Sequence, residues 1–182
     1  MNSKRKILFM AVVILQAAVL LSMIAKQEIL LRTGTKVLLR CIPVDPRSLF
    51  SGDYVRLNYE ISEIRSFNNE ILQKKIDTFS ENDTIYIALA KVEGSKFHSI
   101  AGFSKNPDEL KKNFDVILKG TVDDKYSRLQ IRYGLETYFV PQKEGKKIET
   151  EMADVSAEVS IAADGRSALS KLFIAGKEVK FY

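Results

Sequence analysis

The sequence predicts a mostly β domain, an antiparallel sandwich or distorted barrel with one or two short helices, preceded by one N-terminal transmembrane helix. Three observations indicate this fold class. One long uncharged apolar stretch lies near the N-terminus, short apolar runs with a period of two follow it, and Gly, Asp and Pro stand between those runs. The regular alternation of strands and helices that is typical of a parallel sheet is missing. The 182 residues therefore suit one domain and an anchor.

The apolar stretch, residues 7–25, carries no charge, and Gln16 and Ser22 are its only polar interruptions. As a helix it would be about 28 Å long, close to the roughly 30 Å hydrocarbon core of a bilayer. We therefore expect the protein to contact the membrane bilayer through residues 7–25. A cleaved signal peptide is the alternative, but its apolar region is usually shorter and ends in two small residues, whereas Met23 and Ala25 are the best pair here.

Basic residues flank this segment and predict its orientation. Residues 4–6 are Lys, Arg and Lys, which is typical of the cytoplasmic end of a membrane helix. We therefore expect residues 1–6 to form a cytoplasmic tail, residues 26–35 a stalk, and residues 36–182 an extracytoplasmic β domain. The predicted location is the cytoplasmic (inner) membrane, crossed once. Basic residues within the stalk weaken the charge asymmetry.

Charge and cysteine content exclude several classes of function. All 23 acidic residues follow residue 25, so the chain beyond the anchor carries 25 basic and 23 acidic residues, a net charge of +2. No basic stripe with interleaved aromatic residues is present, which argues against nucleic-acid binding. Cys41 is the only cysteine, so the chain can form no internal disulfide, and we expect Cys41 to be a small buried residue of a strand.

The rest of the chain is read as strands joined by short turns. Asp164-Gly165 and Gly176-Lys177 stand between apolar runs where hairpin turns are expected, which implies antiparallel pairing. Alternation within 54–61 puts Val55, Leu57, Tyr59 and Ile61 on one face of a half-buried strand. The predicted strands are 36–42, 54–61, 84–92, 97–103, 116–122, 127–133, 137–140, 156–163, 168–174 and 179–182, and short helices are expected at 70–76, 107–110 and 142–152.

One motif stands at the start of the second predicted strand. Residues 51–59 read SGDYVRLNY, in which Gly52, Asp53, Tyr54, Leu57 and Tyr59 fit the pattern G-D-Y-x-x-L-x-Y. This stretch resembles the GDYXXLXY family of bacterial proteins. The upstream residues 43–50 (PVDPRSLF) and the downstream residues 133–141 (YGLETYFVP) are similar to further parts of that family. The resemblance implies a membrane-anchored protein and supplies no established activity.

The motif has a structural explanation and a functional one. Gly52 permits a turn, Asp53 can accept hydrogen bonds from nearby amides, and Arg47 can pair with Asp45 or Asp53. Alternatively, polar and aromatic side chains converge at one end of the sheet and bind a partner or ligand. The candidate partner- or ligand-binding residues are Asp45, Arg47, Asp53, Tyr54, Tyr59, Glu136 and Tyr138. Carboxylates at 45, 53 and 136 suit calcium, but their spacing matches no known loop, so no metal is expected.

Catalytic motifs are weak or missing. His98 is the only histidine, with no G-x-S-x-G elbow, and alternation places it on an exposed strand face. Phosphate loops and dinucleotide fingerprints are also missing, so we expect no cofactor. The leading hypothesis is a non-catalytic module that recognises a membrane or envelope partner through the GDY turn, and the class of partner that we expect is another membrane protein. The alternative is an envelope hydrolase with Ser48 or Ser51 as nucleophile and Lys91 as base.

Overall fold

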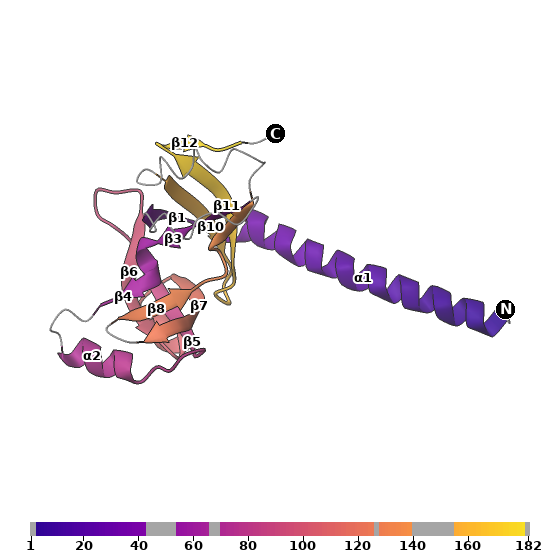
Figure 1. Cartoon of the computed structure of the whole chain (residues 1–182), viewed down its shortest axis with the longest axis horizontal. Coiled ribbons are helices and arrows are strands. Elements are labelled where there is room, and N and C mark those ends of the chain that lie inside the picture. Colours follow the sequence, from indigo (N-terminus) through magenta and orange to yellow (C-terminus); the bar gives the residue numbers. More distant parts are fainter. Residues whose placement is uncertain (1–2, 43–53, 66–69, 126–127, 140–154, 181–182) are drawn as a thin grey trace.

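A long N-terminal helix projects from a β-rich domain in the computed structural model (Figure 1). The structure describes residues 3–42, 54–65, 70–125, 128–139 and 155–180. Helix α1 (Ser3–Thr33) is exposed along its apolar part. Its portion Lys6–Thr33 is the one helix in the described part of the chain that is long and apolar enough to cross a membrane. The predicted fold class, mostly β with an N-terminal apolar helix, is confirmed.

Twelve short strands and two short helices make up the described β domain. The helices are α2 (Glu70–Asp77) and α3 (Pro107–Lys111), and η2 (Glu60–Ser62) is a 3₁₀ turn. The strands are β1 (Thr35–Ile42), β2 (Tyr54–Arg56), β3 (Asn58–Tyr59), β4 (Glu63–Ile64), β5 (Thr84–Lys91), β6 (His98–Ser104), β7 (Val116–Lys125), β8 (Leu129–Arg132), β9 (Thr137–Phe139), β10 (Val155–Ile161), β11 (Ser167–Ile174) and β12 (Lys177–Glu178).

The strands form two five-stranded sheets and one two-stranded ribbon. The first sheet has the order β12-β11-β10-β1-β3, the second has the order β4-β8-β7-β5-β6, and β2 pairs with β9. Every strand pair is antiparallel, as the hairpin turns predicted. Alternate residues of β1, such as Val37 and Leu39, pack in one apolar core with Ile85, Ile87 and Leu118 of the second sheet. Burial of each such side chain contributes about 1.5–3 kcal/mol, so the shared core holds the sheets together.

Residues 54–64, which begin within the motif, contribute strands to the ribbon and to both sheets. The sequence predicted one strand over 54–61, but β2 lies in the ribbon, β3 in the first sheet and β4 in the second. The prediction of a continuous strand was wrong because the segment changes its pairing partner: the amide of Leu57 still donates to the carbonyl of Glu136 at 2.7 Å, next to β9, whereas β3 pairs with β1 and β4 with β8. The alternation itself was right, since Val55, Leu57, Tyr59 and Ile61 are all buried.

Most turns and short helices agree with the sequence prediction. Gly165 and Gly176, with φ of 87° and 78°, occupy the turns of the β10–β11 and β11–β12 hairpins. Asn106 caps α3 by accepting a hydrogen bond from the amide of Asp108 at 3.0 Å. The predicted last strand, 179–182, is instead represented by β12, which ends at Glu178, while residues 181 and 182 lie outside the described residues. The helix predicted at 142–152 also lies outside them.

Helix α1 joins the first sheet with no flexible spacer. The segment 26–35, expected to be a stalk, is helical up to Thr33, and β1 starts at Thr35. Leu30 is buried at the junction, and Lys36 Nζ donates to the carbonyl oxygen of Leu31 at 2.6 Å and to Ser170 Oγ at 3.0 Å. A lysine suits this place because the last carbonyls of a helix lack partners and carry partial negative charge. The end of α1 is therefore packed against the first sheet.

Candidate functional site

The two stretches that resemble the family signatures lie side by side. β2 and β9 pair in the register Tyr54↔Phe139, Val55↔Tyr138 and Arg56↔Thr137. The ribbon therefore joins the end of the GDY motif to the segment that begins at residue 133. Tyr54 and Tyr138 therefore stand at neighbouring positions of this ribbon, in the pairs with Phe139 and Val55.

Two buried tyrosines lock these segments together. The hydroxyl of Tyr59 donates to the carbonyl oxygen of Leu135 at 2.7 Å, and that of Tyr133 donates to the carbonyl oxygen of Ile61 at 2.6 Å. Burial raises the pKa of both tyrosines well above the usual value, and the negative charge of Glu136 adds to this effect. Both hydroxyls therefore stay protonated and act as donors.

Tyr59 has a different role from the one that the motif suggested. Its side chain is fully buried in the core between the sheets, so it offers no surface to a partner in this structure. Leu57, the other apolar motif position, is also buried. The structural explanation of the motif thus accounts for its second half, because Leu57 and Tyr59 anchor the crossing segment.

The remaining candidate residues fall into two groups. Glu136 is half-buried, and its Oε1 accepts a hydrogen bond from the amide of Tyr133 at 2.5 Å. Tyr138 is also half-buried and packs against the main core. Asp45, Arg47 and Asp53 lie outside the described residues, as does the side chain of Tyr54, so their convergence with Glu136 and Tyr138 stays a prediction.

The outward side of the ribbon carries residues that the sequence analysis did not select. Phe139 is 76% exposed at the end of β9, and Arg56 and Thr137 are exposed beside it. The alternation of β2 was a usable signal, since it places Arg56 opposite the buried Val55. No comparable signal distinguished Phe139, because an aromatic residue in a predicted strand is most simply assigned to the core.

A polar pocket of about 380 Å³ adjoins the ribbon. Arg56, Glu136 and Thr137 line it together with ion-paired residues of the second sheet. Arg132 Nε lies 2.7 Å from the carboxylate of Asp123, and Glu63 pairs with Arg65 and Arg128. The hydrogen bond from Arg65 and the charge of Arg128 lower the pKa of Glu63, so this carboxylate stays charged. The pocket beside the ribbon is therefore lined largely by side chains that are held in ion pairs.

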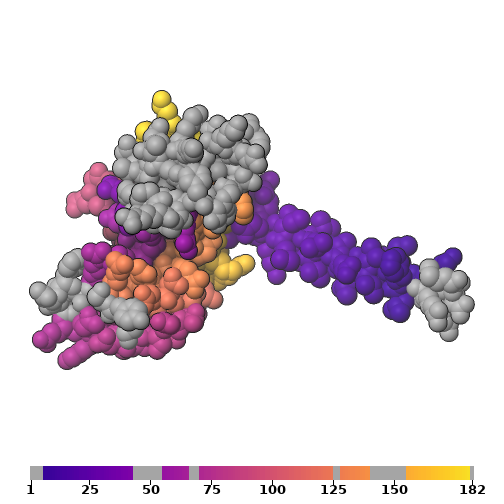
Figure 2. All heavy atoms as spheres, viewed as in Figure 1, coloured from indigo at the N-terminus to yellow at the C-terminus, as the bar shows by residue number. Residues whose placement is uncertain are grey.

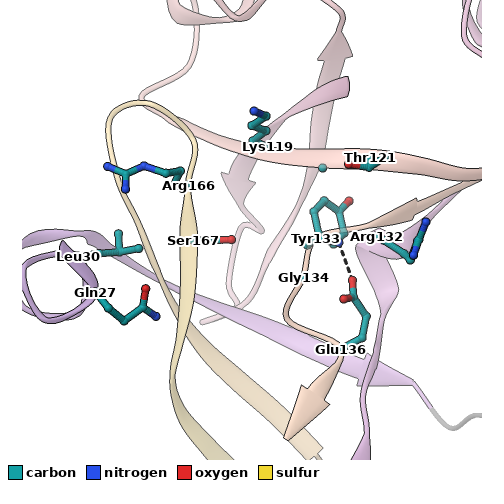
Figure 3. Close-up of a pocket in the computed structure, with 11 residues that line it drawn as sticks. Gln27, Leu30, Lys119, Thr121, Arg132, Tyr133, Gly134, Glu136, Arg166 and Ser167 are labelled. Carbon is teal, nitrogen blue, oxygen red and sulfur yellow. Dashed lines mark hydrogen bonds between the residues drawn. The ribbon is translucent and has the colours of Figure 1, made fainter. Parts of the chain in front are cut away.

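A second pocket, of about 530 Å³, lies at the base of α1 (Figure 3). It is bounded by Gln27 and Leu30 of α1, by the β10–β11 hairpin with Arg166, and by Lys119 of β7. The hairpin rests on the second sheet, because the amide of Lys119 donates to the carbonyl oxygen of Gly165 at 2.9 Å. This pocket therefore combines the helix and both sheets.

Several side chains of types that often serve in catalysis make structural contacts in the described part of the chain. Lys36 contacts Ser160 as well as Ser170, but Ser160 is fully buried and Lys36 also holds the end of α1. Burial raises the pKa of the Cys41 thiol to about 12, which leaves it protonated and unreactive. Ser48 and Ser51, the serines of the hydrolase hypothesis, lie outside the described residues. Among the described residues, His, Cys, Asp and Glu form no group of three that could hold a metal ion.

His98 differs from its predicted exposed position. It is half-buried at the start of β6, and its Nδ1 atom is buried without a hydrogen-bond partner. Burial lowers the pKa of His98, a hydrogen bond with the backbone of Leu38 opposes this shift, and the charge of Lys91 adds to it. The lowered pKa keeps the imidazole neutral near pH 7, so His98 serves the contact between the sheets rather than a surface.

Comparison with known proteins decides the family. The model of the GDYXXLXY protein family matches residues 16–172, from within α1 to β11. The chain belongs to the GDYXXLXY family. Searches of the curated proteins and of the solved structures give no match. The family match covers both signature segments and the crossing segment between them, so the tyrosine lock and the ribbon belong to the part of this GDYXXLXY protein that defines the family.

Proposed function

We propose that this GDYXXLXY protein is a membrane-anchored, non-catalytic module that recognises another membrane or envelope protein. Its anchor is α1, and the basic residues 4–6 support an orientation with the β domain on the extracytoplasmic side of the cytoplasmic membrane. The recognition surface is the outward side of the β2–β9 ribbon together with the adjoining GDY turn. The hydrogen bonds of the buried Tyr59 and Tyr133 connect the segments that carry this surface.

The exposure of Phe139 is the observation that carries this proposal. A large aromatic side chain that is 76% exposed beside Arg56 combines the two residue types that dominate protein interfaces. The ion-paired pocket next to it supplies a polar rim. Ile71 of α2 is even more exposed, at 82%. It is, however, the one large exposed apolar side chain of α2, and single exposed apolar residues are normal on protein surfaces.

Crosslinking followed by affinity capture of the full-length protein from native membranes tests this function. We expect a partner protein to be captured with the wild type and lost with Phe139→Ser, because removal of an interface aromatic commonly costs about 2 kcal/mol or more. Ile71→Ser is the matched control, since it removes a similarly exposed apolar side chain from α2. Asp53→Ala and Tyr54→Ala extend the test to the GDY turn.

The outcomes separate recognition from a purely structural role. Equal capture by all variants that fold, or capture lost equally with Ile71→Ser, would remove the ribbon as the binding surface. Labelling of the purified protein by a serine-reactive probe at Ser48 or Ser51 would support the hydrolase alternative instead. A reporter fused to the C-terminus measures the side of the membrane on which the domain lies.

A further inference from the structure

The pocket at the base of α1 lies where lipid headgroups would surround the helix. The apolar segment ends at Ala25, and Gln27 and Leu30 lie about 3 and 7.5 Å further along the helix axis. The headgroup layer on each side of a bilayer is about 5–7 Å thick. A pocket lined by Gln27 and Leu30 is therefore at the depth of lipid phosphates when α1 spans the membrane.

The β domain is held at this depth by the packed junction. Leu30 is buried against the domain, and Gly34 donates its amide to the carbonyl oxygen of Leu30 at 2.9 Å. α1 contacts both β10 and β11, the strands of the hairpin that borders the pocket. Figure 2 shows yellow atoms of this C-terminal part beside the base of the indigo helix. The hairpin therefore faces the membrane rather than bulk solvent.

Two cations of this pocket are available to an anion. Lys119 and Arg166 are exposed, and no ion pair of Lys119 is found among the residues that the structure describes. Arg166 pairs with Asp164 at 2.6 Å, but both side chains are more than half exposed, and such surface pairs exchange readily for another anion. In Figure 3, Arg166 extends toward the side on which α1 lies.

The other charged groups of the pocket set limits to the site. Arg132 is held by Asp123 on the opposite side, and Figure 3 shows its guanidinium pointing away from Arg166. Glu136 lines the pocket as well, with one carboxylate oxygen occupied by the amide of Tyr133. The anion is therefore expected at Lys119 and Arg166, near the hairpin, rather than at Glu136.

We propose that Lys119 and Arg166 bind the phosphate of an anionic lipid headgroup, so that the β10–β11 hairpin rests on the membrane surface. The proposal relies on the anchoring of α1 in a bilayer. Gln27 can donate its side-chain amide to the same headgroup, and its place on α1 fits the interfacial depth. The lipid phosphate contact fixes which face of the domain looks toward the membrane.

The test uses the full-length protein in lipid nanodiscs that contain phosphatidylcholine alone or with increasing fractions of phosphatidylglycerol. Hydrogen exchange of the amides at 117–121 and 162–167 reports contact with the bilayer. We expect exchange to slow as the anionic fraction rises. Lys119→Gln with Arg166→Gln should reduce the protection gained in anionic discs about 25-fold, because each cation near an anionic surface contributes about fivefold.

Matched variants control for charge and folding. Lys74→Gln with Lys75→Gln removes two cations from α2, which lies on the far side of the domain from α1 (Figure 1), and should leave the protection unchanged. Asp164→Asn removes the competing carboxylate and should increase protection in anionic discs.

Each other result would overturn the inference in a distinguishable way. Equal exchange in neutral and anionic discs would exclude a headgroup site while leaving the anchor intact. Equal protection by inorganic phosphate in neutral discs would show a site for soluble phosphate instead of lipid. Failure of the protein to insert into discs would contradict the anchor itself, and with it the membrane part of the proposed function.

Discussion

Tyr59 shows at the scale of a single residue why a motif position can look exposed in the sequence and be buried in the fold. A tyrosine combines a large apolar ring with one polar atom, so it suits either an interface or a core that supplies an acceptor. Here the carbonyl oxygen of Leu135 is that acceptor, and the ring fills the centre of the core. The acceptor comes from a distant part of the chain, which sequence alternation alone cannot reveal.

The first prediction concerns the hydroxyl of Tyr59. Tyr59→Phe should lower the free energy of unfolding by about 1–3 kcal/mol, because the carbonyl oxygen of Leu135 is left buried without a donor. Chemical denaturation of the full-length protein in detergent measures the change. Tyr86→Phe is the control, since Tyr86 is half-buried on β5 and its hydroxyl has no hydrogen bond to the described residues. An equal loss in both variants would contradict the specific role of the Tyr59 bond.

The second prediction concerns pH and Cys41. Because burial raises the pKa of this thiol from 9.0 to about 12, the native state keeps a proton that the unfolded chain releases. Its stabilising contribution is complete below the unfolded pKa and is lost as the pH rises through the folded pKa. Between about pH 8 and about pH 10, the wild type should lose about 1 kcal/mol of unfolding free energy relative to Cys41→Ala. If the unfolding free energies of the two proteins changed equally with pH, the proposed contribution of Cys41 would be contradicted.

Among the elements, the segment from β2 to β4 has the widest influence because it connects the ribbon to both sheets. Its middle is fixed by two reciprocal bonds, from the hydroxyl of Tyr59 to the carbonyl of Leu135 and from the hydroxyl of Tyr133 to the carbonyl of Ile61. Bonds that hold the same pair of segments are expected to depend on each other, since loss of one lets the segments separate.

A double-mutant cycle of Tyr59→Phe and Tyr133→Phe tests that dependence. We expect the two losses of unfolding free energy to deviate from additivity by at least about 0.5 kcal/mol. Tyr86 packs with a separate apolar cluster, so Tyr59→Phe with Tyr86→Phe should be additive within that margin. If the two cycles give the same coupling energy, the reciprocal bonds do not act as one lock.

Sequence patterns predicted some of these elements correctly and missed others. Local patterns located most described strands, the hairpin glycines and α3 correctly, because period, turn residues and caps are properties of neighbouring residues. They missed the break of the strand after Leu57, because the pairing partners of β2, β3 and β4 are three different strands that lie far apart in the sequence. They also missed the pairing of Lys36 with the end of α1, since a lysine after a membrane helix is most simply assigned to solvent.

For the candidate site, residue type alone selected the polar and aromatic residues around the motif but did not separate buried from exposed ones. Tyr59 and Tyr138 pack inward, whereas Phe139 faces outward, although all three are aromatic residues of predicted strands. The direction of each side chain follows from the ribbon register, which is set by pairing between distant segments.

At the scale of the whole molecule, Gly34 is the residue at which the end of α1 lies against β10. An added Cβ at Gly34 would lie 2.7 Å from the carbonyl oxygen of Leu30 and 3.1 Å from the amide nitrogen of Ile161. Both atoms belong to the backbone, so neither can move without shifting the helix or β10.

Gly34→Ala is therefore expected to loosen the junction. The amides of residues 27–33 should exchange with solvent faster than in the wild type, and the midpoint of thermal unfolding should fall. Gly102→Ala is the control, because an added Cβ there meets only the side chains of Leu110 and Phe114 at 3.5 and 3.7 Å. Unchanged exchange at 27–33 in Gly34→Ala would show that the helix end does not depend on this close contact.

With α1 anchored as proposed, the packed junction between α1 and the first sheet would also let the bilayer change the orientation of the β domain. A membrane helix tilts when its apolar length exceeds the local hydrocarbon thickness, and thin membranes therefore tilt it more. In a chain with a loose stalk such tilting would be absorbed by the stalk. Here α1 continues into β1 through Gly34, so with α1 in a bilayer, as proposed above, tilting of the helix would turn the β domain with it. Membrane thickness would thus set the height and direction in which the β2–β9 ribbon is presented.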